Sequence, residues 1–228
     1  MNRLLTEFLG TFFLVLSIGL SVIGGVAMAP LAIGATLMVM VYMGGHVSGA
    51  HYNPAITLAV FLRGKLPAKD VVPYWVSQVA GALLAAVIAR WVIMGHGIDA
   101  SPVPTSRLIP ALLVEFLYTF ALAMVVLNSA SAPQTAGNSF YGLAIGFTVV
   151  AGAMVGGGIS GGAFNPAVGF GPVLVNAMMG EGTLGNLWLY WVGPLAGGAV
   201  ASAVFGLQER EPLALHAEPS RTPESRPA

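Results

Sequence analysis

An eight-residue segment occurs twice in this chain. It reads SGAHYNPA at residues 48–55 and SGGAFNPA at residues 160–167, 112 positions later. Asn followed by Pro is typical of a helix start, because the Asn side chain accepts hydrogen bonds from free backbone N–H groups and Pro suits the first helical position. The duplication favours a fold in which two related halves each place such a helix start in an equivalent setting.

The remaining sequence has the composition of a membrane protein. Of 228 residues, 56% are hydrophobic and 8% are charged, whereas soluble domains carry about 25% charged residues. The net charge is zero and there is no basic cluster, which argues against nucleic acid as a partner. The chain has no cysteine, its four histidines lack metal-ligand spacing, and no nucleophile is paired with a base. We therefore expect no metal, no cofactor and no enzymatic activity.

Six apolar segments are long enough to cross about 30 Å of hydrocarbon. They cover residues 4–26, 30–47, 71–94, 108–129, 139–158 and 186–206. The first segment also resembles a signal peptide, because Arg3 precedes it and AMA follows it, but it is longer than a typical signal core. Two shorter apolar segments, at 53–62 and 165–178, are predicted to be re-entrant half-helices. At about 1.5 Å per residue, ten residues reach roughly half of a membrane.

The distribution of basic residues predicts the orientation. Six crossings place both termini on one side, and seven of the nine basic residues, including Arg3, Arg63 and Lys65, lie on that side. The positive-inside rule then puts both termini in the cytoplasm. Residues 207–228 are rich in Pro, Glu and Arg without periodicity, which predicts a disordered cytoplasmic tail. We expect a multi-pass protein of the cell membrane.

Two more motif pairs extend the duplication along the chain. EFLGTF at residues 7–12 matches EFLYTF at 115–120, and YWVSQVAGA at 74–82 matches YWVGPLAGG at 190–198. The Tyr and Trp that begin the second pair are expected to be anchors at the membrane interface.

The order of these motifs divides the chain into two repeats, at residues 1–94 and 108–206, joined by a loop at 95–107. Each repeat has three crossings, an odd number, so the second is inverted relative to the first. The half-helices then enter from opposite sides and meet at the midplane with their N-termini facing. Non-helical backbone is tolerated at that depth only inside protein or beside a water-filled cavity, so the sequence predicts a pore or a midplane binding site.

These motifs resemble those of the aquaporin and aquaglyceroporin (major intrinsic protein) family over residues 3–206. The resemblance implies an all-α membrane protein with six transmembrane helices and two re-entrant half-helices in an inverted repeat. It also implies passive conduction of water and small uncharged solutes, and a homotetramer in membrane lipid with one pore per subunit.

The two Asn-Pro-Ala boxes are the expected centre of the pore: Asn53, Pro54 and Ala55 in the first half, and Asn165, Pro166 and Ala167 in the second. Each Asn would cap its helix with the side-chain oxygen and leave its amide NH₂ to donate to a passing water. The two helix N-termini add partial positive charge that repels cations, and a water held by both Asn residues interrupts proton transfer along the file. Backbone carbonyls are expected to line the route at Gly49, Ala50, His51, Gly161, Gly162 and Ala163.

Glu7 and Glu115 are the only acidic residues well inside the predicted crossings. An intramembrane carboxylate marks either function or a specific partner, and a proton relay is one interpretation. The resemblance favours the other, in which each carboxylate supports its re-entrant loop by accepting backbone N–H groups.

The resemblance also places a selectivity filter at Ile33, Ala153, Gly162 and Val168. Water-selective members usually carry an aromatic residue at the first position, His at the second and Arg at the fourth, none of which is present here. We expect a wide, apolar filter that discriminates mainly by size and passes ammonia, hydrogen peroxide, urea or a small polyol together with water.

Two alternatives stay open. A coupled secondary transporter shares inverted repeats and broken helices, but it needs an ion site or a titrating group near the midplane, where this sequence offers Asn, Pro, Gly and Ala. A non-conducting structural member of the family would also be compatible with the altered filter.

Overall fold

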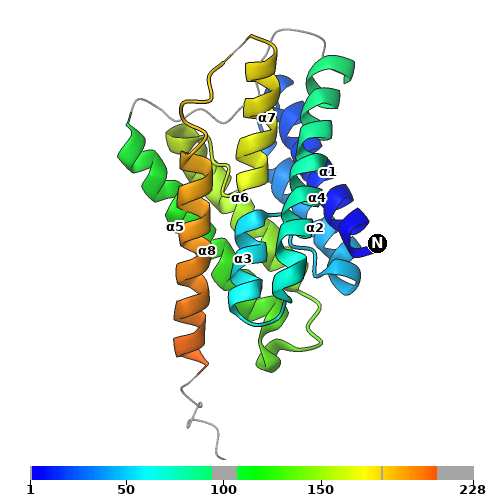
Figure 1. Ribbon diagram of the computed structural model, residues 1–228, viewed down its shortest axis with the longest axis vertical. Coiled ribbons are helices and arrows are strands. Elements are labelled where there is room, and N and C mark those ends of the chain that lie inside the picture. The colour runs from blue at the N-terminus through cyan, green and yellow to red at the C-terminus, as the bar shows by residue number, and fades with distance from the viewer. Residues whose placement is uncertain (1, 94–106, 181, 210–228) are drawn as a thin grey trace, which may run out of the picture.

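The computed structural model describes residues 2–93, 107–180 and 182–209, which form a helical bundle (Figure 1). The α-helices of this part of the chain are α1 (Asn2–Ile23), α2 (Ala29–Ser48), α3 (Pro54–Leu62), α4 (Ala68–Val87), α5 (Leu108–Val126), α6 (Tyr141–Ser160), α7 (Pro166–Met178) and α8 (Leu189–Gln208). A π-helical segment, Ile88–Ile93, extends α4, and another, Leu127–Ser131, extends α5 and precedes a 3₁₀ turn at Pro133–Thr135. Six of the helices are long and apolar enough to cross a membrane, which confirms the predicted crossings.

The helix ends differ from the predicted ones by a few residues. The third crossing begins at Ala68, before the predicted residue 71, because its first turn contains Lys69 and Asp70 and is too polar for a hydropathy pattern to detect. The predicted tail at 207–228 overlaps α8, which continues to Gln208. Residues 210–228 of that tail, and residues 95–106 of the connecting loop, lie outside the described residues.

The bundle contains the same succession of helices twice. Long, long, short and long helices follow one another as α1 to α4 and again as α5 to α8. The short helices interlock the two halves, since α3 packs against α8 and α7 packs against α4. Figure 1 shows α7 in the upper part of the bundle and α3 in the lower part. We call the face towards which α3 runs the α3 side and the opposite face the α7 side.

Glycines allow the long helices to approach each other closely. Gly81 of α4 lies against the backbone carbonyl of Phe8 in α1, and the equivalent Gly197 of α8 lies against the carbonyl of Phe116 in α5. Helices in a membrane gain little from apolar burial, so close backbone packing through small residues holds them together. These contacts fix the frame into which the two short helices are inserted.

Candidate functional site

Two asparagines cap the short helices at the centre of the bundle. Asn53 precedes α3, and its Oδ1 accepts a hydrogen bond from the N–H of Ala55 at 2.8 Å. Asn165 precedes α7 and accepts from the N–H of Ala167 at 2.9 Å. The proline of each box is the first helical residue, where no backbone donor is needed. Both half-helices thus begin where the sequence places their caps.

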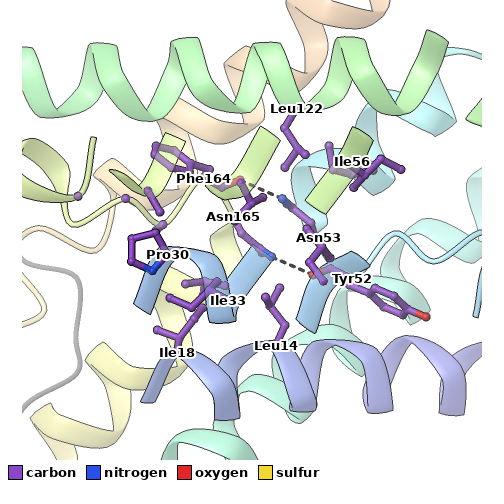
Figure 2. Close-up of a pocket in the computed structure, with 18 of the residues that line it drawn as sticks. Leu14, Ile18, Pro30, Ile33, Tyr52, Asn53, Ile56, Leu122, Phe164 and Asn165 are labelled. Atoms are coloured by element: carbon purple, nitrogen blue, oxygen red, sulfur yellow. Dashed lines mark hydrogen bonds between the residues drawn. The ribbon is translucent and has the colours of Figure 1, made fainter. Parts of the chain in front are cut away.

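The amide nitrogens of the same two side chains connect the half-helices to each other. Asn53 Nδ2 donates to the carbonyl oxygen of Phe164 at 2.9 Å, and Asn165 Nδ2 donates to the carbonyl oxygen of Tyr52 at 2.8 Å (Figure 2). An Asn amide has two N–H groups, so one of them is bound within the protein on each side. This differs from the sequence-based expectation, which left both N–H groups of each Asn to the solute.

Glu7 holds the first re-entrant loop from inside α1. Its Oε1 accepts from the hydroxyl of Ser48 at 2.6 Å and from the N–H of His51 at 3.0 Å. Its Oε2 accepts from the N–H of Tyr52 at 2.7 Å and from Nε2 of Gln78 at 2.8 Å. The carboxylate is fully buried, and these four donors replace the water that it loses.

Glu115 holds the second loop in the same way. Its Oε1 accepts from the hydroxyl of Ser160 at 2.7 Å and from the N–H of Ala163 at 2.9 Å, and its Oε2 accepts from the N–H of Phe164 at 2.6 Å. The position equivalent to the glutamine of the first half is Pro194, which has no donor. The second carboxylate therefore accepts three hydrogen bonds where the first accepts four.

Each carboxylate binds its loop at a residue with a strained backbone. Tyr52 has φ 49° and Phe164 has φ 50°, in the left-handed region that residues with a side chain rarely adopt. The N–H of each of these residues donates to a carboxylate oxygen. Surrounding structure must compensate for such strain, so these contacts support a structural role for Glu7 and Glu115.

A cavity of about 360 Å³ passes beside the asparagine pair. All four positions of the expected filter, Ile33, Ala153, Gly162 and Val168, contribute to its wall. The wall also contains both asparagines and the loop residues Ala50, His51, Gly161 and Ala163. Of the remaining residues singled out from the sequence, Gly49 lines a different cavity, whereas the Pro and Ala of both boxes and the two glutamates are buried away from the wall.

The rest of the cavity wall is apolar. Figure 2 shows Leu14 of α1, Ile33 of α2 and Leu122 of α5 around the asparagine pair. Among the described residues that line this cavity there is no Asp, Glu, Lys or Arg. Apart from Ala153, sequence reasoning missed the contributions of α1, α5 and α6, because in helices that are apolar on every face the pattern does not distinguish a cavity wall from a lipid-facing surface.

A second cavity, of about 400 Å³, lies on the α3 side. Arg3, His46 and Lys65 contribute to its wall, so its mouth is basic. Its wall shares two residues with the central cavity, His51 and Val126. The two cavities therefore adjoin at this pair, on the α3 side of the asparagines.

The two tyrosines expected at the membrane interface are instead packed inside the bundle, whereas the two tryptophans are half-buried. Tyr74 and Tyr190 are each 1% exposed. Their hydroxyls donate to the carbonyls of Ser48 at 2.8 Å and Ser160 at 2.6 Å, where α2 and α6 end. The neighbouring rings of Trp75 and Trp191 lie 6.0 Å apart, edge to face. The expectation was wrong for the two tyrosines, because Tyr near the end of an apolar segment serves equally as an anchor and as a buried hydrogen-bond donor.

Comparison with known proteins agrees with this architecture. The family model "Major intrinsic protein" matches residues 1–205. Aquaporin NIP1-4 of Oryza sativa subsp. japonica is 36% identical over 216 residues, which cover 91% of this chain and 77% of that protein. Aquaporin Z of Brucella melitensis biotype 1 is 34% identical over 236 residues, which cover 92% of this chain and all of that protein.

A solved structure has the same fold. The aquaglyceroporin from Plasmodium falciparum superimposes with a TM-score of 0.76 at 21% sequence identity, and the match covers 94% of this chain and 97% of that one. The chain therefore belongs to the major intrinsic protein family, whose aquaporin and aquaglyceroporin members are membrane channels and not enzymes.

Proposed function

We propose that the chain is a passive pore for water and for small neutral solutes, including ammonia, hydrogen peroxide, urea and small polyols. The observation that carries this proposal is the central cavity, which passes beside the capped asparagine pair and has no charged side chain among its described wall residues. A neutral solute gives up hydrogen bonds to water when it enters such a passage, and the asparagines and loop carbonyls replace most of them. Discrimination then rests mainly on size.

The asparagine pair would orient each passing molecule. One N–H group of each Asn is bound to the opposite loop, and the other donates to the oxygen of a water or hydroxyl. The N-termini of α3 and α7 add about half an elementary charge each at this point. A water held in this way does not transfer protons along the file, and the partial charges repel cations.

The filter residues support a solute range wider than water. Ile33, Ala153, Gly162 and Val168 provide neither a charge nor a side-chain donor, and two of them have little or no side chain. The fixed positive charge that an Arg at position 168 would supply is absent. Exclusion of cations then depends on the helix N-termini, and on the basic mouth of the second cavity at Arg3 and Lys65.

The proposal includes an orientation and an assembly. Both termini lie in the cytoplasm, since Arg3, Arg63 and Lys65 belong to the α3 side, and the cell membrane is the proposed location. Four copies assemble in lipid, each with its own pore. A coupled transporter is disfavoured because the described wall of the central cavity has no carboxylate or lysine that could bind a coupling ion.

Stopped-flow light scattering on proteoliposomes tests the proposal. Vesicles with the purified protein should shrink faster than empty vesicles in an impermeant osmolyte, and should then re-swell in urea or glycerol at a rate that rises linearly with concentration. A rate that saturates would indicate a transporter, and a rate equal to that of empty vesicles would indicate a non-conducting protein. Flux of water alone would refute the wide filter.

A further inference from the structure

Side chains along one face of α6 decrease in size towards the α7 side. Four residues of this helix, spaced four apart, line the central cavity: Ile145, Val149, Ala153 and Gly157. Residues four apart form one ridge along a helix surface. Ala153 belongs to the expected filter, but Gly157 lies one turn beyond it and belongs to no motif that the sequence analysis identified.

The lining residues of two other helices also end in smaller side chains in this direction. On α2, the lining residues in order from the asparagines outwards are Leu37, Ile33, Pro30 and Ala29, and on α1 they are Leu14, Ile18 and Val22. Leu and Ile are equal in size, so the side chains on these two helices become smaller only at the outer end. The cavity is therefore bounded on three sides by helices whose outermost lining side chains are smaller than those beside the asparagines. Less side-chain bulk therefore faces the passage at one mouth than beside the asparagine pair.

Helix packing shows that the ends with the smaller side chains lie on the same side of the bundle in all three helices. Gly34 of α2 lies against Gly146 and Val150 of α6, while Tyr42 lies against Gly142, so α2 and α6 run antiparallel. The small end of the α2 ridge and the small end of the α6 ridge are therefore at the same level. Since α1 is antiparallel to α2, with Thr6 against Gly44, Val22 is at that level too.

The missing side chain of Gly157 has no structural explanation in its surroundings. A Cβ at Gly152 or Gly156 would meet the side chains of Tyr118, Val114 or Phe164, whereas a Cβ at Gly157 would have nothing within 4 Å. The backbone of Gly157 is also ordinary helix and does not need glycine. Glycine within a helix is less favourable than alanine. The only effect of glycine at this position is that the space beside it in the cavity stays open.

We propose that Gly157 is a further size-determining residue of the channel, and that its bare backbone keeps the α7-side half of the passage open to neutral solutes larger than water, such as urea and glycerol. This inference rests on the proposed function. It singles out Gly157 because a side chain at the filter position Gly162 would be strained at φ +66° and would lie 3.2 Å from Gly157 Cα. At Gly157, in contrast, a larger side chain can extend into this half of the cavity without moving the backbone.

Cysteine labelling tests the position of Gly157 without reference to flux. The chain has no native cysteine, so Gly157→Cys creates a unique thiol. Gly158→Cys is the matched control, because Gly158 also has open space around its Cβ but is exposed on the outside of the bundle and does not line the cavity. In proteoliposomes, a charged methanethiosulfonate should modify the thiol at 157 at least about tenfold faster, because a lipid-facing thiol does not ionise. After denaturation in SDS, a maleimide should label both variants equally.

A size series tests the consequence for conduction. Ala, Val and Leu at position 157 should lower the ratio of glycerol to water permeability by steps, to about a tenth of the wild-type ratio for Leu, while the same residues at 158 should change it less than about twofold. Equal effects in both series, or an unchanged ratio at 157, would overturn the inference. If the wild type conducts only water, Gly157→Leu must lower water flux and Gly158→Leu must not.

The two proposals fail in different ways. Wild-type vesicles without any flux would refute the proposed function, and the labelling comparison would still decide whether Gly157 faces the aqueous cavity. Normal wild-type flux together with equal labelling at 157 and 158 would refute the inference alone.

Discussion

Asn53 and Asn165 each donate a side-chain N–H to the backbone carbonyl of the residue that precedes the other. The same side chains cap the two half-helices through their oxygens. One residue type thus performs two tasks at once, since an amide offers both an acceptor for the cap and a donor for the opposite loop. This explains why the chain repeats an Asn-Pro-Ala box in each half.

Replacing Asn53 by Asp separates these tasks. Asn53→Asp keeps an oxygen to accept from Ala55 but loses the donor to Phe164 and brings a carboxyl oxygen against that carbonyl. We expect a loss of about 1–3 kcal/mol in the free energy of unfolding, together with increased proton or cation leak because the partial positive charge at the helix ends is offset. A pH-sensitive dye inside proteoliposomes measures the leak. A folded variant with unchanged leak would show that the amide does not contribute to the barrier.

The sequence was informative about the short helices because their ends are determined locally. Asn at the cap and Pro at the first turn predict α3 and α7 to within a residue, and repeated EFL motifs predict that Glu7 and Glu115 occupy equivalent places. The inversion follows from counting crossings. Each of these inferences needs only neighbouring residues or the order of motifs along the chain.

Apart from the contacts of the two glutamates with their loops, which the family resemblance implied, contacts between distant segments could not be predicted. The hydrogen bond from Gln78 to Glu7 joins residues 71 positions apart and has no equivalent in the second half. The hydroxyl of Tyr74 reaches the end of α2 only because α4 packs there. Likewise, the stepwise ridge on α6 is visible only once the cavity shows which face of that uniformly apolar helix is internal.

Neutralising Glu7 should affect folding before it affects selectivity. In Glu7→Gln, one carboxylate oxygen becomes an NH₂ group that faces donors, so at least one buried N–H or O–H loses its acceptor. We expect a loss of about 3 kcal/mol or more in the free energy of unfolding, because hydrogen bonds to a charged acceptor are the strong ones. Thermal unfolding of the purified protein in detergent measures this loss.

Glu115→Gln is the paired comparison and should be milder, since Glu115 accepts from three donors and not four. A Glu7 variant that assembles normally but conducts a different set of solutes, or protons, would support the relay interpretation instead.

Val126 should control flux where the two cavities adjoin. It lies with His51 in the walls of both, so Val126→Phe should lower the permeability of every solute, water included, by about tenfold, whereas Val126→Ala should leave water flux nearly unchanged. Osmotic permeability from stopped-flow scattering, normalised to the amount of reconstituted protein, provides the measurement. Equal water flux in the Phe and Ala variants would show that the passage does not run between Val126 and His51.

Introducing a positive charge at position 168 should narrow the solute range. Val168 lines the central cavity in the first turn of α7, so Val168→Arg introduces a long side chain and a fixed positive charge beside the filter. The matched control is Val168→Met, which adds length without charge. Both variants should reduce urea and glycerol flux relative to water, because both occupy space. Only the Arg variant should also reduce cation and proton leak, and this reduction should weaken at high salt as the charge is screened.

If the Met variant lowers the leak as much as the Arg variant does, steric closure and not charge determines the barrier. If neither changes the ratio of urea to water flux, solutes do not pass close to Val168.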